Sequence, residues 1–240
     1  MSHSSRSRIA LRTWVSMAML TAVAYVVMLL SKALPQVNGF LQLDLKDTII
    51  CIGGFIYGPL SAAIISIVVA VIEMFTYSDT GPIGCLMNII ATASFCCTAS
   101  FVYKKVHTRK GAIIGLTAGV VVLVVVMLLW NYLITPIYQK VPRDVVAAML
   151  PTVFFPFNLV KGGLNMAIIL LLYKPVVTAL RKARLAPESR GSTPTDSTVT
   201  LNGEPVDAAR AKKLNAGYIL FALALLVTFV TLALVLMGVI

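Results

Sequence analysis

DTIICIGGFIYGPLSAAIISIVVAVIEMF, residues 47–75, decides how the chain threads a membrane. The stretch is apolar almost throughout, but it is too long for one straight span, which needs about 20 residues. Glycines and a proline interrupt its middle, and such a cluster breaks a helix. The cluster consists of Gly53, Gly54, Gly58 and Pro59. We therefore expect a short helix over 47–57, a reversal, and a full helix over 59–76. A single kinked helix is the alternative, and it would invert the topology of every later span.

The composition of the whole chain is that of an integral membrane protein. Of its 240 residues, 59% are hydrophobic and only 12% are charged, which leaves too little polar surface to cover a soluble particle. The formal net charge of +11 is explained by cytoplasmic loops that face anionic lipid. A nucleic-acid partner is not expected, because no basic patch is interleaved with the aromatic residues that such binding needs.

Further apolar stretches predict the remaining helices of an all-α membrane protein. They lie at residues 14–31, 82–103, 111–134, 154–178 and 214–239. We interpret 14–31 as a retained first helix rather than a signal peptide, because it is long and more spans follow it. The expected organisation is a basic cytoplasmic N-terminus (1–13), a six-helix membrane domain (14–180), a flexible polar cytoplasmic linker (181–213) and an additional transmembrane helix (214–240).

The distribution of charge tests this topology. With the N-terminus inside and the 47–75 stretch broken, most of the 20 basic residues fall on the cytoplasmic side. The positive-inside rule therefore favours the broken stretch and places the C-terminus outside the cell. The charges expected on the outer side are Lys32, Lys46, Lys140, Arg143 and Lys161, with Asp44, Asp47, Glu73, Asp79 and Asp144.

Three polar side chains lie about one turn inside the outer ends of their predicted helices. Asn158 and Lys161 are spaced i and i+3, which places them on one helix face, and Asn131 belongs to the preceding span. A lysine at such a depth is costly unless it reaches the headgroups or meets an acceptor. Two interpretations stay open: Lys161 reaches the headgroups while the asparagines bridge helices, or the three residues form a polar pocket for a small organic ligand.

Three blocks of the sequence resemble one transporter family. They are FLQLDLKDTIICIGGFIYGPLSA (40–62), WNYLITPIY (130–138) and FPFNLVKGGLN (155–165), and in this order they look like the riboflavin-specific S component of energy-coupling factor (ECF) transporters over residues 14–180. The resemblance implies a six-helix subunit of a bacterial plasma membrane that binds riboflavin near the extracellular face under its first loop. It also implies a membrane T component and two cytosolic ATPases, whose ATP hydrolysis topples the S component to release the vitamin inside.

The same resemblance implies roles for individual residues. Asn131, Asn158 and Lys161 would contact the flavin ring and the ribityl chain. The residues of the first loop that would cover the ligand are Phe40, Leu41, Gln42 and Leu43. Ala18 and Ala22, spaced i and i+4 on the first helix, would meet the T component, since small residues let helices approach closely in lipid. An ordinary alanine pair without a partner is the alternative.

Several kinds of chemistry have no support in the sequence. No G-x-x-x-x-G-K-[ST] motif occurs, so the chain is not expected to hydrolyse ATP. Its four cysteines lie in apolar spans without C-x-x-C spacing and are interpreted as buried thiols, with no metal, no cofactor and no catalytic site expected. Glu73 is interpreted as the solvated end of its helix, with a coupling carboxylate as the alternative. The alternative functions are an S component for another vitamin or vitamin precursor, and a stand-alone proton-coupled carrier, which would need carboxylates near the midplane.

Overall fold

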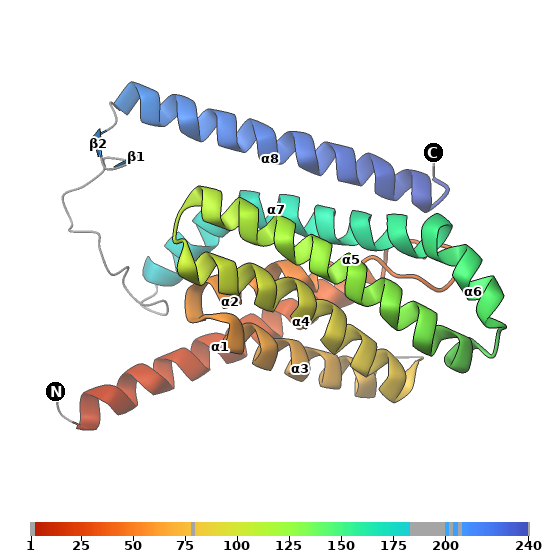
Figure 1. The fold of residues 1–240 in the computed structure, drawn as a ribbon. Helices are drawn as coiled ribbons and strands as arrows, with labels where there is room; N and C mark the ends of the chain where they lie inside the picture. Colours follow the sequence, from red (N-terminus) through yellow and green to blue (C-terminus); the bar gives the residue numbers. More distant parts are fainter. Residues whose placement is uncertain (1–2, 78–79, 183–199, 202–203, 206–207, 240) are drawn as a thin grey trace.

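The computed structural model describes residues 3–77, 80–182, 200–201, 204–205 and 208–239, and these residues form an almost entirely helical protein (Figure 1). The helices are α1 His3–Ser31, α2 Lys46–Tyr57, α3 Pro59–Thr76, α4 Gly81–Lys105, α5 Arg109–Gln139, α6 Arg143–Met149, the π-helical turn η1 Leu150–Phe154, α7 Phe155–Lys182 and α8 Ala208–Leu236. Two short strands, β1 Thr200–Leu201 and β2 Glu204–Pro205, pair with each other. Most of the predicted linker, 181–213, lies outside the described residues.

The long helices are those of a multi-pass membrane protein. Within the described part of the chain, six helical segments are long and apolar enough to span a bilayer. They are Leu11–Ser31, Pro59–Thr76, Gly81–Lys105, Arg109–Gln139, Arg143–Ala179 and Ala216–Leu236. The short α2 completes the bundle, and α8 lies along its outside beside α7 (Figure 1). The predicted fold class, a six-helix bundle with an additional C-terminal transmembrane helix, is confirmed.

The break between α2 and α3 lies at Gly58. Its φ of 101° and ψ of 171° belong to a region that only glycine adopts readily, and its N–H closes α2 by donating to the carbonyl of Gly54 at 2.8 Å. Pro59 then occupies the first turn of α3, where its missing N–H costs nothing. The expected reversal is confirmed, and the alternative of one kinked helix is wrong.

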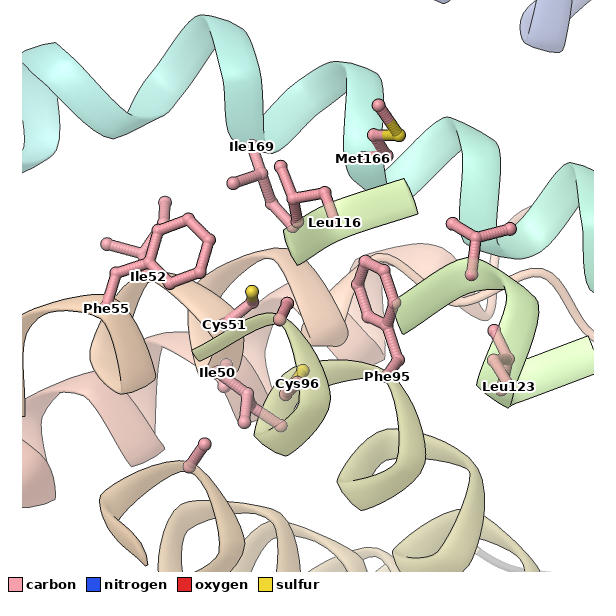
Figure 2. Close-up of a cluster of buried hydrophobic side chains, with 14 of the residues drawn as sticks. Ile50, Cys51, Ile52, Phe55, Phe95, Cys96, Leu116, Leu123, Met166 and Ile169 are labelled. Carbon is pink, nitrogen blue, oxygen red and sulfur yellow. The ribbon is translucent and has the colours of Figure 1, made fainter. Parts of the chain in front are cut away.

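The apolar core joins α2, α4, α5 and α7, and Figure 2 shows side chains of all four helices pointing toward one another. Glycines let α5 approach α4 closely. A Cβ built on Gly119 would lie 2.7 Å from the carbonyl oxygen of Phe95, and one on Gly115 would lie 2.7 Å from that of Ala99. The G-x-x-x-G pair of α5 therefore serves packing inside the bundle.

The segment 135–152 separates the predicted helices 111–134 and 154–178, where the sequence predicts no helix, but most of it is helical. Helix α5 continues to Gln139 with Pro136 inside it, and α6 begins at Arg143, so the connection is only three residues long. The start signals of α6 are a proline in the preceding position and Asp144 in the first turn. At Leu150–Phe154 the helix passes through one π-helical turn before α7 begins at Phe155.

Candidate functional site

The first loop, residues 32–45, folds over one end of the bundle as a small hairpin. Val37 and Leu41 form an antiparallel bridge, with N···O distances of 2.7 and 3.0 Å. Asn38 and Gly39 make the turn with positive φ angles of 51° and 75°, a conformation that these two residue types tolerate best. The turn brings Phe40 against Phe154 of η1, with the ring centroids 6.1 Å apart in an edge-to-face arrangement.

The amide of Gln42 holds this loop to the end of α1. Its Nε2 donates to the carbonyl oxygens of Ser31, Lys32 and Leu34 at 3.1–3.3 Å. These carbonyls belong to the last turn of α1 and its continuation, where backbone acceptors lack helical partners. The amide nitrogen of Gln42 therefore holds the loop in place, and only the side-chain carbonyl oxygen of Gln42 remains available to bind a ligand.

All three polar residues singled out from the sequence are buried. Asn131 is 4% exposed, Asn158 is 3% exposed and Lys161 is 7% exposed. Each asparagine donates to a carbonyl one turn earlier on its own helix, Asn131 to Met127 at 2.7 Å and Asn158 to Phe154 at 2.8 Å. Among the described residues, no hydrogen bond joins the three side chains to one another. They lie on two helices, α5 and α7, that pack together.

Lys161 points into the protein rather than to a headgroup region. Its Nζ lies 3.9 Å from Oδ2 of Asp47, at the start of α2. Thr92 donates to the other oxygen of that carboxylate at 2.6 Å, whereas Oδ2 is buried and accepts no hydrogen bond. A buried cation and a buried acceptor thus face each other beyond hydrogen-bond distance. This is a pair of polar groups that a bound molecule could bridge.

The other loop residues proposed from the sequence lie in different surroundings. Leu43 is 1% exposed and packs with Phe157 and Val160 of α7. Leu41 is half-buried at the edge of the same group, and Phe40 is 39% exposed at the turn. These side chains form an apolar cover above the beginning of α7.

Sequence analysis missed that six of the charged side chains come together in a largely buried group, which we call the charge cluster. Lys46 lies between two carboxylates, 2.6 Å from Asp44 and 2.7 Å from Glu73, and Glu73 also pairs with Lys32 at 3.1 Å. Asn88 donates to Glu73 at 3.2 Å. The interpretation of Glu73 as a solvated helix end is wrong, because Glu73 is 3% exposed and Lys46 only 1%. The charge cluster consists of Lys32, Asp44, Lys46, Asp47, Glu73 and Lys161.

Opposite charges in the charge cluster compensate for the burial of Asp44. Burial alone would raise the pKa of the Asp44 carboxyl, but the charges of Lys46 and Lys161 outweigh this effect and hold its pKa below the ordinary value. Asp44 also accepts from the backbone N–H of Lys46 at 2.8 Å. The carboxylate therefore stays ionised where the loop enters α2.

Asn165 is a second residue that sequence analysis missed. Its Nδ2 donates to the carbonyls of Asp44 and Lys161 at 2.9 and 3.0 Å, and its Oδ1 accepts from Thr48 at 2.8 Å. One amide thus joins the loop, α2 and α7. The signal was present, because Asn165 follows Asn158 and Lys161 at i+7 and i+4 on the same helix face.

The alanines predicted to contact a partner line a groove on the outside of the bundle. Ala18 and Ala22 are exposed on α1, beside an apolar groove of about 430 Å³ between α1 and α3. Trp14, Thr21, Tyr25 and Ile72 also line it. Small residues such as Ala18 and Ala22 let helices approach closely in lipid.

Comparison with known proteins places the chain in a family. The family model of ECF transporter substrate-specific components matches residues 12–173. The riboflavin transporter FmnP of Bacillus subtilis (strain 168) is 28% identical over 188 residues, which is 71% of this chain and 96% of the relative. The riboflavin transporter RibU of Staphylococcus aureus (strain TCH60) is 27% identical over 174 residues, 70% of this chain and 92% of the relative.

A solved structure agrees with these relatives. The S component of a bacterial ECF transporter superimposes with a TM-score of 0.59 at 27% identity, covering 70% of this chain and 97% of the other. The matched region, 12–173, contains the first loop and all three predicted polar residues but ends before α8. The chain belongs to the ECF transporter substrate-specific components.

Proposed function

We propose that this protein captures riboflavin at the extracellular side of a bacterial plasma membrane and delivers it inward together with a membrane T component and two cytosolic ATPases. Two relatives that align over nearly their whole length are named riboflavin transporters, which supports this ligand. As a member of a family of transport components, the chain is not an enzyme.

The observation that carries the proposal is the buried pair of Lys161 and Asp47, whose Nζ and Oδ2 atoms lie 3.9 Å apart, beyond hydrogen-bond distance. Riboflavin has a ring edge that carries alternating carbonyl and N–H groups and a ribityl chain with hydroxyls. A lysine ammonium can donate to a carbonyl or hydroxyl oxygen, and a carboxylate oxygen can accept from an N–H or O–H. The amides of Asn131 and Asn158 would supply further partners after small rotations. Phe40, Leu41, Gln42 and Leu43 would then cover the ring.

Partners are proposed from the family and from the groove on α1. The assembled importer would place a helix of the T component against Ala18 and Ala22, where small side chains allow close approach. ATP hydrolysis by the two ATPases would drive the movement that opens the site to the cytoplasm. The sequence has no G-x-x-x-x-G-K-[ST] motif, so energy would come from other subunits or, for the stand-alone carrier, from a gradient.

Equilibrium binding of riboflavin, followed by quenching of its fluorescence, tests the ligand. We expect tight binding to the wild type and an affinity loss of about 1–3 kcal/mol, or roughly 5- to 150-fold, for each of Asn158→Ala and Lys161→Ala, since buried partners are left unpaired. Lys104→Ala is the matched control, because Lys104 is exposed at the last turn of α4.

The outcomes separate ligand from site. If the wild type leaves flavin fluorescence unchanged, riboflavin is rejected as the ligand, and other vitamins and vitamin precursors would be tested next. Riboflavin binding that is equal in wild type, Asn158→Ala and Lys161→Ala would keep the ligand and reject the site. A stand-alone proton-coupled carrier would accumulate riboflavin in proteoliposomes that contain this chain alone under a pH gradient, whereas the proposed subunit would not.

A further inference from the structure

Helix α8 lies outside the region that matches the family, yet it packs closely on the bundle. The family model ends at residue 173, and α8 begins at Ala208. A Cβ built on Gly163 of α7 would overlap the ring of Phe229 of α8, so the absence of a side chain at Gly163 admits this ring. Close contact at a glycine is how helices associate in lipid, where no hydrophobic effect drives them together. The contact therefore fixes where the Phe229 ring of α8 lies along α7.

The last turns of α8 reach the first loop. Ala233 is buried in an apolar group with Val37 and Leu43 of the loop and Phe157 and Val160 of α7. The side chains that pack against this group are Leu41, Phe229, Leu236 and Met237. We call these nine residues the loop–α8 group. Helix α8 thus runs antiparallel to α7 (Figure 1) and contributes directly to the packing of the loop.

The middle of the loop depends on this packing. The end of the loop is held by polar contacts, because Gln42 binds the end of α1 and Asn165 binds the Asp44 carbonyl. Val37, at the base of the hairpin, is 3% exposed and packs within the loop–α8 group. Without α8, one side of the hairpin would face lipid chains instead of ordered side chains.

We propose that α8 stabilises the closed position of the first loop and so slows the exchange of the bound molecule. The identity of the bound molecule rests on the proposed function, whereas the effect of α8 on the loop does not. Helix α8 would act as a positioning element: it touches no ligand, but it raises the energy needed to lift Val37 and Leu43 away from α7.

Two measurements test this inference in the full-length protein. The first is the dissociation rate of radiolabelled riboflavin, followed by its loss from the protein after an excess of unlabelled riboflavin is added. The second is hydrogen exchange of the backbone of residues 37–43 without ligand. We expect Phe229→Ala and Leu236→Ala to speed dissociation by about tenfold, since changes at packed contacts act mainly on the off-rate, and to raise exchange in the loop. Phe221→Ala is the matched control, because Phe221 is 45% exposed on the same helix.

A double variant tests the contact itself. Gly163→Ala should displace the Phe229 ring and give the same faster dissociation and faster loop exchange. In the Phe229→Ala background, Gly163→Ala should add nothing, because the overlapping ring is gone.

The result that overturns the inference is a loop that exchanges at the wild-type rate in both Phe229→Ala and Leu236→Ala. If the wild type does not bind riboflavin, the proposed function fails, and loop exchange alone still decides the role of α8.

Discussion

Replacing Glu73 by glutamine removes one negative charge from the charge cluster and keeps the size of the side chain. In the wild type, Glu73 lies 2.7 Å from Lys46 and 3.1 Å from Lys32, and it accepts from Asn88 at 3.2 Å. After the change, Lys46 keeps Asp44 at 2.6 Å, but Lys32 loses the ion pair that the structure gives it. Lys46 then has one carboxylate partner instead of two, and Lys32 has none among the described residues.

The expected cost follows from this geometry. Breaking a buried ion pair by removing one partner costs about 3–5 kcal/mol. The lower end applies here, because Lys46 retains Asp44 and the Lys32 side chain is 20% exposed and can be solvated. We expect a loss of about 3 kcal/mol, which for a chain of this length lowers Tm by roughly 6–12 °C.

The buried thiols of the protein provide the assay. Cys51, Cys85 and Cys96 are buried, so a dye that fluoresces on reacting with thiols reports unfolding as purified protein in detergent is heated. Asp144→Asn is the control, because it removes an exposed carboxylate in the first turn of α6. Its Tm should stay within about 2 °C of the wild type.

A second substitution checks that the charges of Lys46 and Glu73 act together. Lys46→Met leaves Asp44 and Glu73 without the cation between them and should cost more than Glu73→Gln. The double variant should be more stable than the sum of the two losses predicts. A Tm for Glu73→Gln equal to that of Asp144→Asn would refute the argument that the charge cluster stabilises the bundle.

Three further predictions concern the site, the groove and the helix break. Asp47→Asn should weaken riboflavin binding by about 1–3 kcal/mol, measured by fluorescence quenching, because Lys161 loses its nearest counter-charge; unchanged affinity would contradict the pairing. Ala18→Leu should reduce co-purification with the T component and leave riboflavin binding intact, since it fills part of the groove; intact assembly would reject that surface. Gly58→Ala should lower stability by about 1–3 kcal/mol in the thiol-dye assay, because alanine is strained at the Gly58 φ of 101°. Gly217→Ala is the control: a Cβ at Gly217 on α8 would meet no neighbouring atom, so the change should be neutral or slightly stabilising.

The path of the backbone was largely predictable, because its signals are local. Gly58 and Pro59 mark the reversal, and long apolar runs mark the spans, so each element depends on residues next to one another in sequence. Helix α6 was missed because its seven residues are too few to show a periodic pattern, although Asp144 marks its first turn.

The charge cluster was not predictable, because its members come from three separate parts of the chain. Lys46 and Glu73 are 27 residues apart, and each alone resembles a charge at a helix end. Only the fold of α2 against α3 and α7 shows that they are buried together. The same is true of Lys161 and Asp47. The residues next to each of them in sequence do not indicate that the two side chains face each other.

The balance of charges in the charge cluster affects how the protein can move in an energised membrane. Three lysines and three carboxylates sum to zero, so a tilt or rotation that carries them together transfers no net charge through the membrane field. A single uncompensated charge that crossed the whole field would add or remove about 2.3 kcal/mol per 100 mV. With respect to these buried groups, reorientation of this domain would thus be electrically silent, because the membrane voltage would do no net work on them.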